Sequence, residues 1–340
     1  MKHFSAQGSA GVIQEASGPA VRSMRAAVLT GPGQIRMADV PLRRPGQGEV
    51  RVRLEGCGVC ASNLGPWQGG PGLTYPMAPG APGHEAWGVV DALGPGVTGL
   101  EAGQRVALLS QNAYAQFDFA PAAAVVALPP ELEGRPFPGE PLACAVNIFG
   151  RSGIEPGQHV LIIGIGFMGA LLTSLCAAAG ARVTAVSRRP YALEVARRCG
   201  AQLCMLSADA DAVRGHVHEI TGGQGCRRVI EAVGMQWALD LATDLIAVRG
   251  RLVVAGYHQD GPRQINMQQW NWRGIDVVNA HEREPAVYLQ GLRTALEAVQ
   301  SGRLDPGPLL THCFGLDQLP AAFDLMQQRP EGFLKAWIRL

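Results

Sequence analysis

Residues of metal-binding types stand at three places in the first half of the chain. Cys60 lies in GCGVCASN shortly after a strand-like segment, and His84 and Glu85 follow in PGHEAWG beside another. Catalytic zinc sites use thiolate, imidazole and carboxylate ligands and leave one position open to water or substrate. These three residues meet that requirement, and Glu140 in GEPLAC offers a further carboxylate that would complete the set. The pattern predicts a catalytic metal site.

Other interpretations of the same residues are open. Cys57 and Cys60 form a C-x-x-C, which is typical of redox-active pairs and of half a structural zinc site. The chain has no second C-x-x-C and no thioredoxin-like context, which argues against both. His84 taken alone would commonly be a core histidine, and Glu140 taken alone would be an exposed loop carboxylate.

A glycine motif predicts a dinucleotide site. The segment VLIIGIGFMG is an apolar strand that leads into G-x-G-x-x-G, with a helix-like run behind it. Gly164 permits the tight turn, Gly166 lets the backbone approach a pyrophosphate, and Gly169 lets the helix pack closely on the strand. Phe167 and Met168 open that helix, whose free N–H groups and partial positive charge favour phosphates.

The end of the next strand indicates which dinucleotide binds. An NAD site usually places Asp or Glu about 20 residues beyond the glycines, where it holds the ribose 2′-hydroxyl. This chain has Ser187, Arg188 and Arg189 instead. Two guanidinium groups suit a 2′-phosphate, and no carboxylate is present to repel it. The sequence therefore favours NADP, although an arginine pair in a loop can also be solvated charge.

Further cofactor contacts are expected where parallel strands end near the cleft, since ligands of such sheets collect there. Val233 and Gly234 of the EAVG segment and Gly256 occupy such positions.

The bulk composition describes a globular protein. Hydrophobic residues make up 47% of the 340 residues and charged residues 17%, with a net charge of +1. The sequence shows neither the excess of basic residues that is typical of nucleic-acid binding nor an apolar segment long enough to span a membrane. The eight cysteines are scattered and no secretory signal is seen, so we expect reduced thiols and a cytoplasmic location. Residues 1–23 are expected to be a disordered extension.

The hydrophobic pattern predicts two kinds of architecture, and hence an α/β fold class. Strands are expected at 24–30, 49–55, 86–93 and 104–109, separated by Gly- and Pro-rich turns that include a long loop at 65–83. From about 148 strands and helices alternate, which predicts a parallel sheet with helices on both faces. The expected elements there are strands at 160–164, 182–186, 228–232, 251–255 and 275–279 and helices at 168–179 and 190–199. A helix at 285–301 and a final strand at 333–340 follow.

The ordered set of motifs resembles the zinc-dependent alcohol and polyol dehydrogenases of the medium-chain dehydrogenase/reductase superfamily, over residues 24–340. The resemblance implies a GroES-like, mostly antiparallel catalytic domain formed by 24–147 and 284–340. It further implies a Rossmann NADP-binding domain with a doubly wound parallel sheet at 148–283, and a catalytic zinc between the two.

By this resemblance Cys60 and His84 are zinc ligands, and Glu85 is a ligand or a neighbour that moves in and out of the coordination sphere. Glu140 stands where the polyol dehydrogenases carry a glutamate and the alcohol dehydrogenases a cysteine. Ser62 matches the hydroxyl that shuttles the substrate proton.

The sequence departs from the family pattern in several places. Residues 104–128 contain none of the four cysteines that hold a second, structural zinc in many members, so we expect one catalytic zinc and no structural one. The usual Asp three residues after the ligand Cys is Asn63, and the relay histidine is replaced near Gly65. Lys335, in the final strand, resembles a basic residue that contacts the cofactor phosphates in related enzymes.

These observations predict a dehydrogenase that transfers hydride between NADP(H), preferred over NAD(H), and a small alcohol or carbonyl substrate. A zinc-free quinone or enoyl reductase of the same superfamily is one alternative, and a non-catalytic NADP-binding protein is another. The first would lack Cys60 and the His84–Glu85 pair, and the second would be expected to lose ligands while keeping its glycines. The resemblance also implies a homodimer or homotetramer, paired through the edge strand at about 275–280.

Overall fold

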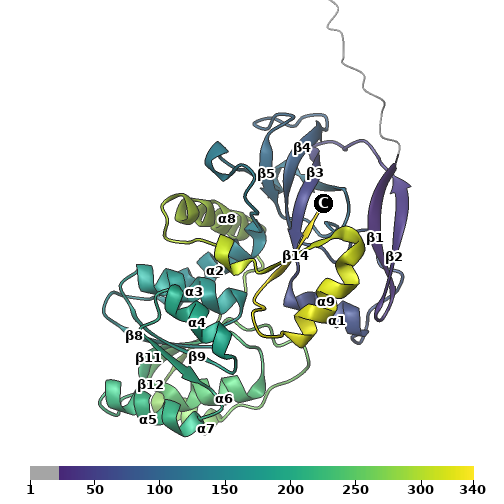
Figure 1. Ribbon diagram of the computed structural model, residues 1–340. Coiled ribbons are helices and arrows are strands. Elements are labelled where there is room, and N and C mark those ends of the chain that lie inside the picture. The colour runs from purple at the N-terminus through teal and green to yellow at the C-terminus, as the bar shows by residue number, and fades with distance from the viewer. Residues whose placement is uncertain (1–22) are drawn as a thin grey trace, which may run out of the picture.

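The computed structural model describes residues 23–340, which form two lobes, each built on its own sheet (Figure 1). Of the extension expected at 1–23, residues 1–22 lie outside the described part, and Ser23 begins the first strand. None of the helices within residues 23–340 is long and apolar enough to cross a membrane.

A six-stranded parallel sheet forms the first lobe, in the order β10-β9-β8-β11-β12-β13. Its strands are β8 (His159–Ile163), β9 (Arg182–Ser187), β10 (Leu203–Leu206), β11 (Cys226–Glu231), β12 (Ile246–Val254) and β13 (Asp276–Asn279). The order reverses between β8 and β11, which is the doubly wound arrangement whose ligands bind at the reversal point. The predicted parallel sheet is confirmed.

Helices cover both faces of this sheet because its strands are apolar on both sides. Val160 and Ile162 of β8 pack with one set of helices, while Leu161 and Ile163 pack with the other. The first set comprises α3 (Phe167–Ala178), α4 (Pro190–Arg198) and α2 (Gly139–Ser152), and the second comprises α5 (Ala210–Ile220) and α6 (Gln236–Leu245). A short helix, α7 (Met267–Arg273), precedes the edge strand β13.

A mostly antiparallel sheet forms the second lobe. Its strands are β3 (Glu49–Gly58), β4 (Glu85–Leu93), β5 (Arg105–Leu108), β6 (Phe117–Pro121), β7 (Val125–Ala127), β14 (His312–Gly315) and β15 (Ala336–Arg339). The C-terminal strand β15 pairs antiparallel with β3, and β14 pairs parallel with β15. The sheet is therefore assembled from both ends of the described chain.

The first two strands stand apart from that sheet. β1 (Ser23–Gly31) pairs with β2 (Gln34–Pro41) in a two-stranded ribbon, which an isolated bridge between Ala26 and Ala115 links to the rest. The strand at 24–30 was predicted, but β2 was not, because the stretch between 30 and 49 was assigned to Gly- and Pro-rich turns.

Helices connect and cover the two lobes. α8 (Pro285–Gln300) confirms the predicted helix at 285–301 and packs against α2, which also contacts α3 and the strand β4. The domain boundary expected between 147 and 148 falls inside α2, so this helix links the lobes. α9 (Leu319–Gln328) lies beside the short α1 (Leu64–Gln68), as Figure 1 shows.

Candidate active site

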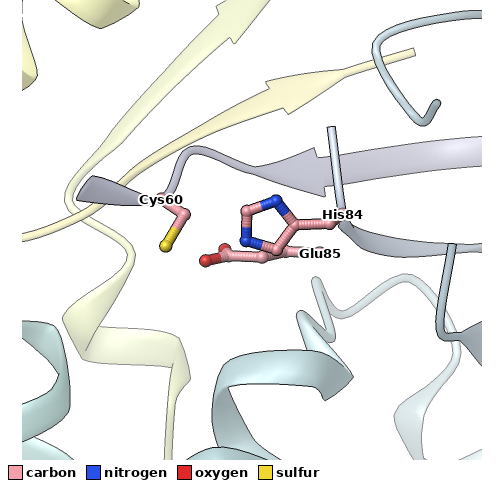
Figure 2. A group of neighbouring side chains, drawn as sticks. All are labelled: Cys60, His84 and Glu85. Carbon is pink, nitrogen blue, oxygen red and sulfur yellow. The ribbon is translucent and has the colours of Figure 1, made fainter. Parts of the chain in front are cut away.

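Cys60, His84 and Glu85 lie together beside β3 and β4. Cys60 follows β3 and caps a 3₁₀ turn, η1 (Ala61–Asn63), while Glu85 is the first residue of β4 and His84 precedes it. The two strands pair antiparallel, which brings the end of one next to the start of the other. The ligand atoms of the three residues all lie within 4.8 Å of one another. Figure 2 shows the three side chains converging on one space.

A glycine opposite Glu85 makes room for its carboxylate. Gly58 is the register partner of Glu85, and a Cβ added to Gly58 would lie 1.8 Å from Glu85 Oε2. The buried carboxylate of Glu85 meets Lys335, whose Nζ lies 2.6 Å from each of its oxygens. Only Oε1 receives the ammonium with hydrogen-bond geometry, so Oε2 has no hydrogen-bond partner among the described residues.

His84 is oriented by the backbone. Its Nδ1 lies 2.9 Å from the carbonyl oxygen of Pro82, which also accepts a 3.1 Å hydrogen bond from Asn63 Nδ2. A donor Nδ1–H leaves the Nε2 lone pair available to a metal, the usual arrangement of a ligating histidine. Asn63 Oδ1 also accepts from the backbone N–H of Cys60, so one amide ties both ligand loops together.

The electrostatics of the cluster favour a cation. Burial disfavours a charged imidazole, but a hydrogen bond to Cys60 and the negative charges of Cys60, Glu140 and Glu85 raise the pKa of His84 to about 10. A cysteine sulfur, an imidazole, and a buried carboxylate with one oxygen that accepts no hydrogen bond form a donor set that suits zinc. The residues therefore fit the metal.

Glu140 lies near this cluster but outside it. It sits in the first turn of α2, not in the loop that one interpretation had it occupy, and is half-buried. Its Oε1 accepts a hydrogen bond from the hydroxyl of Tyr288 and lies 3.6 Å from the Sγ of Cys144. Burial raises the pKa of Glu140, while the neighbouring charge of His84 acts in the opposite direction.

Two further predictions concern Cys57 and Ser62. Cys57 is buried among the apolar side chains of the second lobe, as expected of a core residue and not of a redox partner for Cys60. Ser62 lies on η1, half-buried and two residues from Cys60.

The glycine motif has the expected form at the end of β8. Gly164 has a φ of +98°, and a Cβ there would lie 2.4 Å from Val233 Cγ2. A Cβ on Gly169 would lie 2.0 Å from the carbonyl oxygen of Gly164, so close packing of α3 requires glycine. A Cβ on Gly166, the N-cap of α3, would meet nothing within 4 Å. Gly166 thus borders an open space in front of α3, whose first residues are Phe167 and Met168. This space at a helix N-terminus fits a pyrophosphate.

The predicted 2′-phosphate residues lie at the end of β9. Ser187 is buried and its Oγ accepts from the backbone N–H of Arg189 at 3.3 Å. Arg188 is exposed, with its guanidinium carbon 5.6 Å from the Trp237 ring centroid. The guanidinium of Arg189 donates to the carbonyl oxygen of Phe333 in the other lobe, at 2.5 Å. Arg188 is thus available to a ligand, while Arg189 also links the lobes.

Glu231 connects the segments that follow β11 and β12 through side-chain hydrogen bonds. Its Oε1 accepts from the backbone N–H groups of Val233 and Gly234 at 2.7 and 2.8 Å, and its Oε2 lies 3.0 Å from His258 Nε2. A Cβ on Gly256 would lie 2.2 Å from Gly234 N. The segments predicted to contact the cofactor are therefore packed against each other next to the reversal point of the sheet.

Lys335 lies between the metal-binding residues and the glycine motif. Its ammonium lies 5.0 Å from the centroid of the Phe167 ring, beside the glycine motif, but is paired with Glu85. Burial acts to lower the pKa of Lys335, but the charges of Glu85, Cys60 and Glu140 and the hydrogen bond to Glu85 together outweigh it, so the pKa is raised. The positive charge of Lys335 therefore compensates the negative charge of the Glu85 carboxylate.

Sequence reasoning missed Tyr288, Cys144 and His258. Tyr288 stands in an amphipathic helix and Cys144 one helical turn after Glu140, positions that are typical of packing residues. His258 follows the end of β12, and its place in a strand-end loop was the one available signal.

Comparisons with known proteins agree with this geometry. Residues 46–129 match the family model of the alcohol dehydrogenase GroES-like domain, and residues 168–297 match that of the zinc-binding dehydrogenases. An alcohol dehydrogenase of Cupriavidus necator is 28% identical, over 93% of this chain and 98% of that protein. A sorbitol dehydrogenase of Halalkalibacterium halodurans is 26% identical, over 88% and 95%. A short chain alcohol dehydrogenase of Escherichia coli CFT073, solved with NADH, shares the fold with a TM-score of 0.83 and 20% identity, over 94% and 100% of the two chains.

Proposed function

Because this chain belongs to the zinc-type alcohol and polyol dehydrogenases of the medium-chain dehydrogenase/reductase superfamily, we propose that it transfers hydride between NADP(H) and an alcohol or carbonyl substrate at a zinc site. It is an alcohol-dehydrogenase-like oxidoreductase that uses a nicotinamide cofactor. The observation that carries the zinc proposal is the convergence of Cys60, His84 and Glu85 within 4.8 Å, at the junction with the cofactor lobe.

We assign the residues of the site the following roles. Cys60 and His84 would hold the metal, with Glu85 as the third residue of the group. Zinc would supply Lewis acidity, which lowers the pKa of an alcohol or polarises a carbonyl. Ser62, two residues from Cys60 on η1, would pass the substrate proton outward. The hydride chemistry itself belongs to the nicotinamide, and the protein supplies position and electrostatics.

The preference for NADP rests on the end of β9. Ser187 presents a small hydroxyl in place of a carboxylate, and Arg188 presents an exposed guanidinium. Arg189 and Arg188 repel each other, and burial together with the charges of Arg329 and Arg188 lowers the pKa of Arg189. A dianionic 2′-phosphate would relieve this crowding of positive charge.

The glycine-rich turn would hold the rest of the cofactor. Gly164, Gly166 and Gly169, with the Phe167 and Met168 amides, would cradle the pyrophosphate, and Val233, Gly234 and Gly256 would line the nicotinamide side. Lys335, whose ammonium pairs with Glu85 and lies 5.0 Å from the Phe167 ring centroid, would add a positive charge near the cofactor phosphates.

Domain limits, assembly and location are proposed on the same basis. Residues 24–147 and 284–340 would form the catalytic domain and 148–283 the cofactor domain, with α2 as the link. Pairing through β13 would give a dimer or tetramer, and the reduced cysteines suit the cytoplasm.

The test is metal content together with cofactor binding. Protein purified without chelator and supplied with zinc should hold about one zinc per chain and bind NADPH more tightly than NADH. A metal content near zero with cofactor binding intact would refute the zinc mechanism and leave the zinc-free reductase or the binding-protein alternative. Equal affinity for the two cofactors would refute the NADP preference alone.

A further inference from the structure

A carboxylate, an imidazole and a guanidinium form a hydrogen-bonded network beside the predicted cofactor contacts, and the proposed reaction does not use it. His258 Nε2 lies 3.0 Å from Glu231 Oε2, and Arg263 Nε donates to His258 Nδ1 at 2.8 Å. Because Nδ1 accepts from the guanidinium, the ring proton is on Nε2 and is donated to the carboxylate. The side chains of Glu231, His258 and Arg263 are 0%, 16% and 15% exposed, so little water competes for these contacts.

The Glu231–His258–Arg263 network holds Gly234 at both of its backbone groups. Glu231 Oε1 accepts from the N–H of Gly234 at 2.8 Å, and the guanidinium of Arg263 donates to the Gly234 carbonyl oxygen, also at 2.8 Å. Gly256 fits closely between them, since a Cβ there would lie 2.7 Å from Glu231 Oε2 and 2.2 Å from Gly234 N. The loop after β11 and the loop after β12 are therefore fastened to each other by these side chains.

The two fastened loops reach from the glycine motif to the metal-binding residues. At one end, a Cβ on Gly164 would lie 2.4 Å from Val233 Cγ2. At the other end, Gln259 Nε2 lies 3.5 Å from the carbonyl oxygen of Ala61, the neighbour of Cys60. A dinucleotide with its pyrophosphate at the glycine motif must place its nicotinamide between these two ends if hydride is to reach a substrate at the metal. The network therefore borders the space for the nicotinamide ring.

We propose that His258 and Arg263 are positioning residues for the nicotinamide half of the cofactor, acting through Glu231 and Gly234. The inference rests on the proposed dehydrogenase function. Loops that are already fastened in place lose little conformational entropy when the ring binds, which favours binding. The adenosine half is expected at the end of β9, and β8 separates β9 from β11 in the sheet. Loss of the network should therefore weaken the binding of the nicotinamide half alone.

Two ligands separate the nicotinamide half from the rest of the cofactor. Calorimetric titration compares NADPH with 2′-phospho-ADP-ribose, which keeps the pyrophosphate and the 2′-phosphate but lacks the nicotinamide. Arg263→Gln and His258→Leu should each weaken NADPH binding about ten-fold, as loss of a hydrogen bond to a charged group predicts. The affinity for 2′-phospho-ADP-ribose should not change. NADH should lose the same factor as NADPH, because the two share the nicotinamide half.

The double variant shows whether His258 and Arg263 act as one unit. It should bind NADPH no more weakly than the weaker single variant, because either substitution breaks the same connection. Arg273→Gln is the matched control, since the Arg273 guanidinium also donates to backbone carbonyl oxygens, at the end of α6 and the start of β12. This control should lower the thermal midpoint and leave the affinities for both ligands unchanged.

Each result supports the inference or overturns it. Wild-type protein that binds neither NADPH nor NADH would refute the cofactor proposal and the inference with it. If wild type binds NADPH and both single variants bind it equally well, only the inference fails. An equal loss for NADPH and 2′-phospho-ADP-ribose would overturn it too, because the network would then support the whole lobe. Losses that add in the double variant would overturn the claim that His258 and Arg263 act through one network.

Discussion

Lys335 and Glu85 form a buried ion pair, 250 residues apart in the chain and 2.6 Å apart in space. The glutamate begins β4, and the lysine immediately precedes β15 at the other end of the protein. Their side chains are 7% and 0% exposed, so neither charge has water to compensate it. The pair fixes the carboxylate that faces Cys60 and His84.

Loss of this lysine should destabilise the metal-free protein. Lys335→Met leaves the charge of Glu85 buried and alone, and such a change lowers the free energy of unfolding by about 3–5 kcal/mol. Bound zinc would replace the missing positive charge, so the variant should gain more thermal stability from zinc than wild type does. Urea unfolding with and without zinc measures both effects.

An exposed ion pair supplies the control for Lys335. Arg25 and Asp317 also lie 2.6 Å apart, but their side chains are 49% and 59% exposed. Arg25→Met should cost less than about 1 kcal/mol. Equal losses in the two variants would show that burial does not govern the Lys335 pair.

Replacement of Cys60 should abolish metal binding. Cys60→Ser removes the thiolate from the cluster, so the zinc content should fall from about one per chain toward zero and turnover should fall at least 100-fold. Cys313→Ser, which changes an exposed cysteine on β14, should leave both unchanged. Full turnover and metal content in Cys60→Ser would contradict the assignment of the site.

Removal of the Arg188 guanidinium should weaken NADPH binding selectively. Arg188→Gln removes one charge-assisted contact to the 2′-phosphate, which is worth about ten-fold to a hundred-fold in affinity. NADH, which lacks that phosphate, should bind as before. Fluorescence titration of both reduced cofactors measures the ratio, and Arg198→Gln at the end of α4 is the matched control.

Arg189 and Ser187 should behave differently from Arg188. Arg189→Gln breaks the hydrogen bond to the Phe333 carbonyl oxygen. It should therefore weaken the binding of both NADPH and NADH, or lower the thermal stability, in addition to reducing the selectivity for NADPH. Ser187→Asp should shift preference toward NADH through repulsion of the phosphate. Unchanged selectivity in both Arg188→Gln and Ser187→Asp would place the 2′-phosphate elsewhere.

Two glycines should separate folding from cofactor binding. A Cβ on Gly166 meets no protein atom within 4 Å, so Gly166→Ala should fold with a loss of at most about 1 kcal/mol but should bind neither NADPH nor NADH. Gly169→Ala places its Cβ 2.0 Å from a carbonyl oxygen and should cost about 1–3 kcal/mol of stability. Thermal melts and cofactor titrations of the two variants are the measurement. Normal cofactor binding by Gly166→Ala would contradict the pyrophosphate position.

The elements that carry strong periodicity could be predicted from the sequence. β8, α3 and β9 follow the strand–glycine–helix–strand pattern closely, and Cys60, His84 and Glu85 belong to short motifs whose spacing indicates a metal. The helix α2 could not be predicted, because Pro138, Gly139 and Pro141 at its start are typical of a loop. Proline is nevertheless favourable in the first turn of a helix, where its missing N–H has no partner to lose.

The partners of the site residues were harder to predict than the residues themselves. Nothing in the local sequence of Lys335 or Tyr288 indicates a carboxylate partner, because each meets its glutamate only through the tertiary fold. The burial that makes these contacts strong is likewise a product of packing between distant segments.

The sheet shared by β3 and β15 has a consequence for the order of events at the ribosome. The six strands of the parallel sheet lie within residues 159–279, so that lobe can form as soon as this stretch has emerged. The metal-binding residues are made much earlier, yet Glu85 receives its ammonium only when Lys335, 250 residues later in the chain, leaves the exit tunnel. A chain that stops before Lys335 would carry Cys60, His84 and Glu85 and still lack the charge that holds the Glu85 carboxylate in place.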